Sequence, residues 1–344
     1  MLKTTNFNLI IFIIFLTYNI NSLNIKDNHI KYFTLCGTTM GTSWKIIISD
    51  NHIKKKLKFI KKNVQHILNK CEKKISSWNV SSFVSTFDKY KINQPKLIDK
   101  DIEKILSISI NIGKKTHNAL DITIGKLINI WGFGTTIQPI HYPSKKIIQE
   151  TKLNTGLNNI QLIKNTFGTY VQKKNNAIKI NLSTIGEGYA ADQVRHFLKN
   201  VTQNYIISIG GVVIGNNTNK KKYIDVNILL PIKNKNIIHR TIHLTKDKAI
   251  STSGVYRNYY YLHNKYISHL INPITGKPIN NNLLSVSVIS NSALIADTWD
   301  TALMILGFQE AKKISILEKL PVYIIRKEKK NIIIWYSPQF KQFL

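Results

Sequence analysis

The feature that most restricts the fold of this chain is the segment IADTWDTALMILG at residues 295–307, where two aspartates interrupt an apolar run. On a helix, Asp297 and Asp300 are three residues apart and share one face, with Thr301 beside them. Burying two unpaired carboxylates in a protein core is very costly. The segment therefore predicts a helix whose apolar side packs against a core, while its two carboxylates meet solvent, lysines or a cation.

The chemistry of this group favours one type of metal. Two carboxylates and a hydroxyl present only oxygen atoms, which suit a hard cation such as Mg²⁺ or Ca²⁺. Zinc prefers nitrogen or sulfur ligands. From the residues alone, both the cation site and a plain solvent-facing helix remain open.

The composition allows a sizeable core but no disulfide scaffold. The chain has 344 residues, of which 43% are hydrophobic, enough for one large domain or two ordinary ones. Its two cysteines, Cys36 and Cys71, are too few for a disulfide framework, although they could form a single bridge.

The chain is strongly basic, with 49 lysines and arginines against 18 acidic residues and a formal net charge of +31. Such a charge is typical of proteins that bind nucleic acid, anionic lipid or phosphate groups. Here the lysines are spread along a chain that is also rich in asparagine and isoleucine, which favours compositional drift. No helix–turn–helix, RNA-recognition or zinc-finger signature is present, so we expect no nucleic-acid partner.

The N-terminal segment, residues 1–30, resembles an export signal. One lysine precedes an apolar run over residues 9–16, which is too short for a comfortable transmembrane helix. The cleavage site is poor, and Cys36 is not preceded by a lipobox. We therefore expect an exported protein whose first 30 residues are either a cleaved signal peptide or a membrane anchor, with a buried N-terminal element as the alternative.

The remainder, residues 31–344, is predicted to form one α+β domain, because helical and extended patterns mix without a βαβ rhythm. Apolar residues at helical spacing predict helices over 52–74 and 100–116. Other segments read as strands or as strand–turn–helix units. These are a turn and strand at 39–49, a strand, glycine turn and helix at 176–200, a strand broken by Gly210 and Gly211 at 204–215, and a strand at 285–290.

Three further segments carry possible chemistry. Gly186 and Gly188 flank Glu187 at the start of a predicted helix, where backbone amides can bind an anion, or where the turn is a simple cap. In the stretch at 251–279 a polar STSG loop and two tyrosine-rich turns precede His269, which is either a general base or a structural histidine. Asp121 lies in NALDITIGKLINIWGFG, which reads equally well as a ligand-facing turn and as a structural turn with a core tryptophan.

Taken together and in this order, the motifs resemble one family, the flavin transferases of the ApbE type, which attach FMN from FAD to proteins. The resemblance covers roughly residues 38–344 and is highly specific as a set. The motifs are TMGTSW, SSW at 76–78, NALDITIGKLINIWGFG, STIGEGYAAD, SIGG, STSGVYRNYY, SHLINPITGKPI, ADTWDTALMILG and the C-terminal WYSPQFKQFL.

The resemblance implies a function and a partner. It implies an α+β single-domain enzyme that binds FAD and Mg²⁺, cleaves the FAD pyrophosphate, and joins FMN by a phosphoester bond to a Thr or Ser of another protein, releasing AMP. It also implies an exported protein at the periplasmic face of the inner membrane, acting on a flavin-bearing subunit of a membrane electron-transport complex.

The resemblance also assigns roles to residues. It implies that His269 is the base for the accepting hydroxyl. The implied metal ligands are Thr184, through a main-chain oxygen, and Asp297, Asp300 and Thr301. The implied flavin contacts are Met40, Trp78, Ala119, Leu120, Asp121, Asn181, Glu187 and Ile271.

Three positions depart from the family pattern. Asn181 and Asn272 stand where the family commonly has Asp, and Lys126 stands where Pro is common. Asparagine keeps the shape and an acceptor but loses the charge. Asn181 and Asn272 leave a non-catalytic flavin-binding protein as one alternative to the transferase. An FAD pyrophosphatase, in which water replaces the accepting hydroxyl and yields FMN and AMP, is the other.

Overall fold

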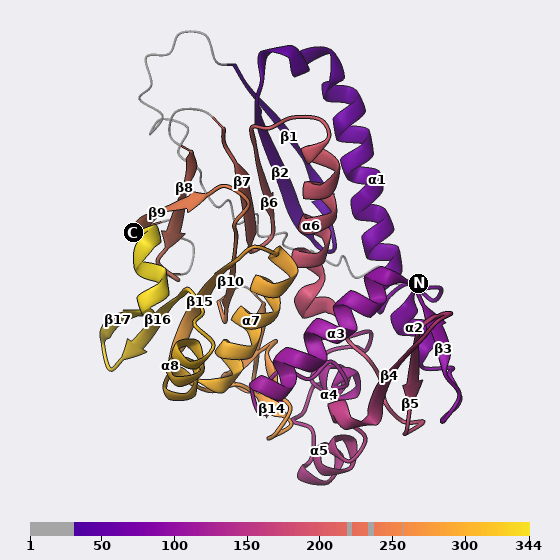
Figure 1. The fold of residues 1–344 in the computed structure, drawn as a ribbon. Helices are drawn as coiled ribbons and strands as arrows, with labels where there is room; N and C mark the ends of the chain where they lie inside the picture. Colours follow the sequence, from indigo (N-terminus) through magenta and orange to yellow (C-terminus); the bar gives the residue numbers. More distant parts are fainter. Residues whose placement is uncertain (1–30, 219–221, 233–236, 257) are drawn as a thin grey trace, which may run out of the picture.

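The structure is a computed structural model, and it describes residues 31–218, 222–232, 237–256 and 258–344 (Figure 1). The predicted N-terminal signal or anchor, residues 1–30, lies outside the described residues. No helix in the described part of the chain combines the length and the apolar character needed to span a bilayer.

A large antiparallel sheet organises the molecule. Its eight strands lie in the order β1-β2-β6-β7-β10-β15-β16-β17, and all neighbouring strands pair antiparallel. Their bounds are β1 (Tyr32–Thr39), β2 (Thr42–Ser49), β6 (Tyr205–Ile209), β7 (Val212–Asn216), β10 (Ala249–Gly254), β15 (Leu283–Ser290), β16 (Val322–Glu328) and β17 (Asn331–Tyr336).

Helices cover one face of this sheet. In Figure 1, α6 lies between α1 and α7, in agreement with the contacts of these three helices. The α-helices are α1 (Leu57–Ile75), α2 (Phe83–Phe87), α3 (Lys100–Lys115), α4 (Gly125–Ile130), α5 (Lys145–Lys152), α6 (Gly186–Lys199), α7 (Ala293–Leu306) and α8 (Phe308–Leu317). Short 3-10 helices are η2 (Asn51–Lys56), η3 (Leu157–Asn159), η4 (Ser183–Ile185) and η5 (Pro338–Phe343).

The opposite face of the sheet is covered by a hairpin and the C-terminus. Side chains alternate along each strand, so Val212 and Ile214 of β7 join the core under the helices, whereas Val213 packs against the hairpin and η5. The hairpin consists of β8 (Tyr223–Leu229) and β9 (Ile238–Thr245).

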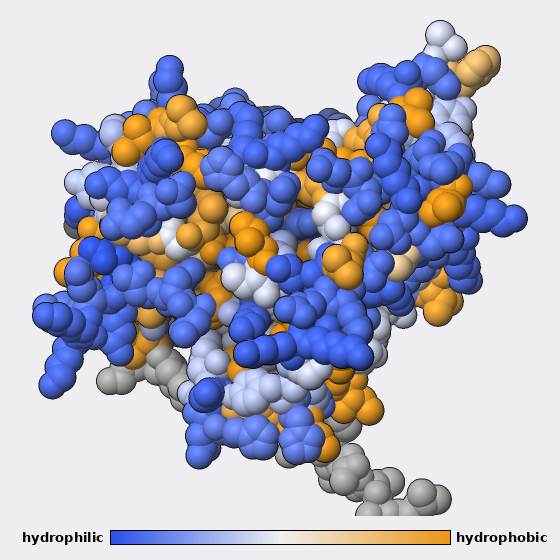
Figure 2. All heavy atoms as spheres, turned by 90° about the horizontal axis from the view of Figure 1, so that it is seen from below, coloured by the Kyte–Doolittle hydropathy of each residue, from blue (hydrophilic) through white to orange (hydrophobic). Residues whose placement is uncertain are grey.

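The remaining strands form small sheets. These are β3 (Lys96–Ile98), β4 (Ile160–Asn165) and β5 (Gly168–Lys173) in the order β3-β5-β4, β11 (Tyr259–Leu262) with β12 (Lys265–Ser268), and β13 (Ile271–Asn272) with β14 (Lys277–Pro278). Seen from below, the surface is mostly hydrophilic, with hydrophobic side chains in small groups (Figure 2). The mixed architecture confirms the α+β prediction.

Most predicted elements are present, but two local predictions are wrong. The helices at 52–74 and 100–116 correspond to η2–α1 and α3, and the strand broken by Gly210 and Gly211 is the hairpin β6–β7. The strand expected near residue 180 is reduced to a single bridge between Ile124 and Lys179, because Asn181 turns the chain there.

The prediction of a polar STSG loop is also wrong, since residues 251–254 belong to β10 in the centre of the large sheet. The two tyrosine-rich turns that follow it form the β11–β12 hairpin instead. Cys36 is exposed and Cys71 is buried, and both are free thiols.

Candidate active site

The two aspartates of α7 lie inside the molecule. Ser292 caps the helix by accepting a hydrogen bond from the Ile295 amide at 3.4 Å. Asp297 is 7% exposed and Asp300 is 1% exposed, so the solvent-facing alternative is wrong. The predicted helix is confirmed, but its carboxylate side is buried against neighbouring elements.

Asp297 is held by two elements that are distant in sequence. The Gly188 amide of α6 donates to Asp297 Oδ2 at 2.8 Å, and the Ser251 hydroxyl of β10 donates to Oδ1 at 3.3 Å. Burial raises the pKa of Asp297 well above its ordinary value, and the negative charges of Asp300 and Glu187 raise it further. A cation would relieve both effects.

A glycine turn between β6 and β7 and a glycine inside α6 make this junction possible. The Gly211 amide donates to Glu187 Oε2 at 2.7 Å, and a Cβ on Gly210, whose φ is +51°, would come within 2.1 Å of the same carboxylate. A Cβ on Gly188 would meet the Ala293 carbonyl oxygen at 2.5 Å. Gly188 therefore allows an approach of α6 to α7 that a larger residue would prevent, and Gly210 supplies the positive φ of the turn.

The residues at this junction fit a hard divalent cation. Thr301 Oγ1 donates to Asp300 Oδ1 at 3.3 Å, and η4, which contains Thr184, packs against α7. Over the residues the structure describes, no three His, Cys, Asp or Glu side chains gather as a metal site. A cation held here would depend on two carboxylates plus threonine oxygens, a donor set that suits Mg²⁺.

The predicted flavin residues around Asp121 lie beside the junction. Asp121 Oδ1 accepts from the Thr123 amide at 2.7 Å and the Thr123 hydroxyl at 2.6 Å, and burial raises its pKa. Ala119 and Leu120 are 2% and 3% exposed and share a hydrophobic cluster with Trp299 of α7. Their side chains are core residues.

Asn181 joins the Asp121 loop to the start of α6. Its amide donates to the Ile122 carbonyl oxygen at 2.8 Å, and its Oδ1 accepts from the Ser183 amide at 3.0 Å. The neutral side chain thus keeps an acceptor role in a turn next to Thr184.

Met40 and Trp78 differ in their placement. Met40 has a φ of +50°, its amide donates to Glu72 Oε2 at 3.3 Å, and its sulfur lies 3.4 Å from the position of a Cβ on Gly186. Met40 therefore lies at the start of α6. Trp78, in the turn after α1, is 73% exposed and is not packed into the junction.

His269 is oriented by the backbone. His269 Nδ1 lies 2.8 Å from the Asn258 carbonyl oxygen, which can only accept, so Nδ1 carries the proton and Nε2 is the basic nitrogen. Its ring makes an edge contact with Phe133, with centroids 6.3 Å apart.

The loop after His269 is tied to the segment that ends at Gly134. Asn272 Oδ1 accepts from the Ile274 and Thr275 amides at 2.8 and 3.1 Å, so asparagine preserves this turn. Trp131 Nε1 donates to the Gly276 carbonyl oxygen at 2.8 Å. Trp131 and Ile271 are buried in one cluster, so Trp131 is a core residue rather than an open wall.

Sequence reasoning missed the roles of Ser251 and Gly188. The STSG motif identified the segment but not the bond from Ser251 to Asp297. The close approach at Gly188 depends on a contact across 109 residues, which local patterns do not reveal.

Comparison with known proteins decides the family. The ApbE family model matches residues 40–324. The chain belongs to the ApbE family. Among curated ApbE relatives, the FAD:protein FMN transferase of Buchnera aphidicola subsp. Baizongia pistaciae is 48% identical over 340 residues, covering 97% of this chain and 98% of that protein. The Escherichia coli K12 protein of the same name is 38% identical, covering 93% and 91%.

A solved structure agrees with this assignment. The flavin transferase ApbE from Vibrio cholerae superimposes with a TM-score of 0.81 at 27% identity, covering 92% of this chain and all of that one. The likeness extends over the whole α+β domain described above.

Proposed function

We propose that this chain is a Mg²⁺-dependent FAD:protein FMN transferase. The observation that carries the proposal is the buried pair Asp297 and Asp300 on α7, of which Asp297 is bonded to α6 and β10, in a member of the ApbE family. The curated relatives bear the name of this activity over nearly their full length.

In the proposed reaction, the hydroxyl oxygen of an acceptor Thr or Ser forms a bond to the phosphorus of the FMN half of FAD. The bond from that phosphorus to the bridging oxygen breaks, and AMP leaves with the electron pair. His269 Nε2 takes the hydroxyl proton, because Nδ1 is occupied by the Asn258 carbonyl. The acceptor supplies the nucleophile, so the enzyme needs no activated serine of its own.

The α7 carboxylates would hold the cation. Asp297, Asp300, Thr301 and a main-chain oxygen of Thr184 are the proposed ligands. When bound, Mg²⁺ neutralises charge on the phosphoryl oxygens and on the leaving AMP. Gly188 and Ser251 fix the orientation of the Asp297 carboxylate before substrate arrives.

The flavin would lie against the surrounding loops. Met40, Asp121, Asn181 and Glu187 lie at or next to the start of α6, whereas Ile271 lies in the cluster of Trp131. The exposed Trp78 is available to cover the bound isoalloxazine ring. Ala119 and Leu120 have buried side chains, so their contribution would come from the backbone. Asn181 and Asn272 retain their turn hydrogen bonds, which supports activity in spite of the lost charge.

The site of action is also a proposal. An apolar segment over residues 9–16 supports export, and we place the enzyme at the periplasmic face of the inner membrane, with residues 1–30 either cleaved or anchoring it. A flavin-bearing subunit of an electron-transport complex is the proposed acceptor.

An acceptor mass-shift assay tests this function. The protein is incubated with FAD, Mg²⁺ and an acceptor domain carrying the target threonine, and intact masses are measured together with AMP. Transfer predicts one FMN per acceptor and one AMP per modified acceptor. Rapid AMP release without acceptor would identify a pyrophosphatase instead, and FAD binding with no product would identify a non-catalytic flavin-binding protein.

A further inference from the structure

Asp192, on α6, caps the N-terminus of the helix that carries the catalytic carboxylates. Its Oδ2 accepts from the Ser292 hydroxyl at 2.6 Å and the Leu294 amide at 3.2 Å, and its Oδ1 accepts from the Ala293 amide at 2.9 Å. These amides are among those that an isolated helix leaves without partners. A carboxylate here also interacts favourably with the positive end of the helix dipole.

The cap lies one helical turn from the site. Gly188 and Asp192 are four residues apart on α6, and Ala293 and Asp297 are four residues apart on α7, so each pair lies on one face of its helix. Gly188 contacts Asp297 while Asp192 contacts Ala293, so the two helices run antiparallel and meet at two successive levels. The contact between Gly188 and Asp297 holds the proposed metal ligand, and the contact between Asp192 and Ala293 fixes the position of α7 along α6.

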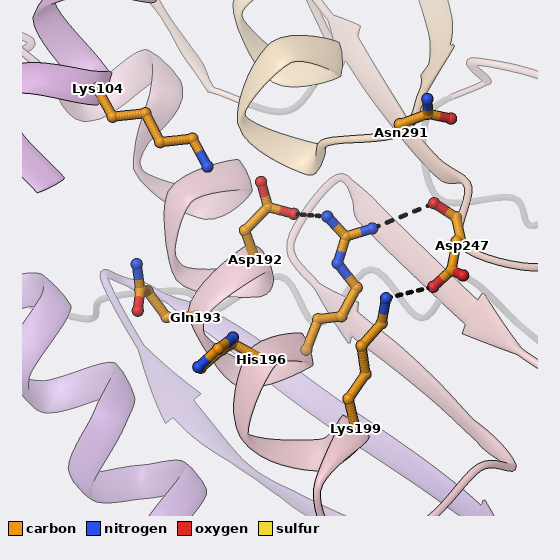
Figure 3. A pocket seen from close by; sticks show the side chains of 8 residues that line it. Lys104, Asp192, Gln193, His196, Lys199, Asp247 and Asn291 are labelled. Carbon is orange, nitrogen blue, oxygen red and sulfur yellow. Dashed lines mark hydrogen bonds and ion pairs between the residues drawn. The ribbon is translucent and has the colours of Figure 1, made fainter.

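Arg195 extends this contact to the third element. Its Nη2 pairs with Asp192 Oδ1 at 2.6 Å, and its Nη1 donates to the Asp247 carbonyl oxygen at 3.3 Å. Asp247 lies in the turn before β10, the strand that carries Ser251. Figure 3 shows Asp192 and Asp247 on opposite sides of this bridge. The pair therefore connects α6, α7 and β10, which together position Asp297.

Asp192 and Arg195 line a cavity of about 720 Å³, together with Lys104, Gln193 and Lys199 (Figure 3). The side chain of Asp192 is 9% exposed and that of Arg195 is 13% exposed. Water from this cavity can replace part of a shortened side chain, so a variant at Asp192 should still fold.

We propose that Asp192, supported by Arg195, is a positioning residue for the metal ligands of α7. Because α7 is one continuous helix, a shift at its first turn moves Asp297 and Asp300 together. The inference rests on the proposed function. It adds that the cap at the N-terminus of α7 determines where the carboxylates of the metal site lie. Outer partners of metal ligands commonly matter in this way.

The test uses Mn²⁺ as the probe and the full metal-free chain. Free Mn²⁺ is followed by electron paramagnetic resonance during titration of wild type, Asp192→Ala, Asp192→Asn and the control Gln193→Ala. Gln193 neighbours Asp192 and lines the same cavity but bonds to Asp101 of α3, not to α7. Melting temperature, kcat and the KM for FAD are recorded for each variant.

We expect the Mn²⁺ affinity of Asp192→Ala to fall about 10- to 100-fold, as for other outer partners of metal ligands. Asp192→Asn keeps one acceptor oxygen and should lose less. In both variants kcat should fall more than KM rises, and Gln193→Ala should bind Mn²⁺ as wild type does.

If the Asp192 variants melt earlier but bind Mn²⁺ and turn over as wild type does, Asp192 is only a helix cap and the inference is overturned. If Asp192→Ala does not fold, Asp192→Asn decides the question alone. Wild-type protein that binds no Mn²⁺ would overturn the proposed metal site itself, a result distinct from failure of the cap alone.

Discussion

At the junction of α6, α7 and β10, Asp297 and Asp300 are 7% and 1% exposed, whereas Trp78, in the turn after α1, is 73% exposed. Asp297 is fixed by the Gly188 amide, the Ser251 hydroxyl and the close approach of Gly188, and Asp300 accepts from the Thr301 hydroxyl. Trp78 packs against no core cluster. Under the proposed function, this difference separates a cation end that is built in advance from an open end at Trp78 that is completed when ligands arrive.

Asp300→Ala should produce the largest change, because it removes a carboxylate from the prebuilt end. A bound cation supplies several kcal/mol of transition-state stabilisation, which corresponds to a loss of turnover of about 10³-fold or more. FAD turnover and metal-dependent melting are the measurements.

The metal-free Asp300→Ala variant should melt no earlier than wild type, because the negative charge beside Asp297 is gone. Glu310→Ala removes a carboxylate from α8 that is 47% exposed, and it should leave turnover unchanged. Wild-type turnover in Asp300→Ala would exclude Asp300 as a ligand.

His269→Asn should cause the next largest loss. Removing a general base costs about 10²- to 10⁴-fold, and transfer to the acceptor should fall within that range. Binding of FAD and Mn²⁺ should stay at wild-type strength, since His269 bonds to Asn258 and contacts Phe133, both of which lie outside α7.

His263→Asn, on the neighbouring β11–β12 turn, is the matched control for this variant. The backbone there has a φ of +46°, which asparagine tolerates. Equal losses in the two histidine variants would show that His269 acts only through the loop structure.

Trp78→Ala tests the open end and should have a smaller effect. Losing one aromatic contact of about 0.5–1.5 kcal/mol should raise the KM for FAD about 2- to 13-fold without changing the melting temperature. Phe167→Ala, on another exposed side chain at 84%, should leave KM unchanged. A wild-type KM in Trp78→Ala would remove Trp78 from the flavin site.

Thiol labelling should have the smallest effect on activity. It compares a buried cysteine with an exposed one. Burial raises the pKa of Cys71 to about 11, so this thiol stays protonated at pH 8 and reacts slowly. Cys36 is exposed and should react first, with turnover unchanged. Two thiols should titrate after denaturation; fewer would indicate a disulfide bridge.

The sequence predicted elements whose signals are local. The apolar run around Asp297 and Asp300 identified α7, and helical periodicity identified α1 and α3. The prediction failed at residues 251–254, where Ser, Thr and Gly favour a loop but pairing with β7 and β15 enforces a strand.

Contacts between segments distant in the chain could not be predicted from the sequence either. The bond from Gly188 to Asp297 spans 109 residues, and the cap from Asp192 to Ala293 spans 101. Neither has a local signature, because each depends on how α6 packs against α7. The motifs suggested candidate site residues, but the junction at which α6, α7 and β10 meet emerges only from the folded chain.

The most direct test is a crystal of the full chain grown with FAD and Mn²⁺ and measured at the manganese absorption edge. The account predicts one strong anomalous peak within bonding distance of Asp297, Asp300 and Thr301, with the FAD pyrophosphate beside it. Bound FAD with no peak at α7, or a peak on other residues, would contradict it.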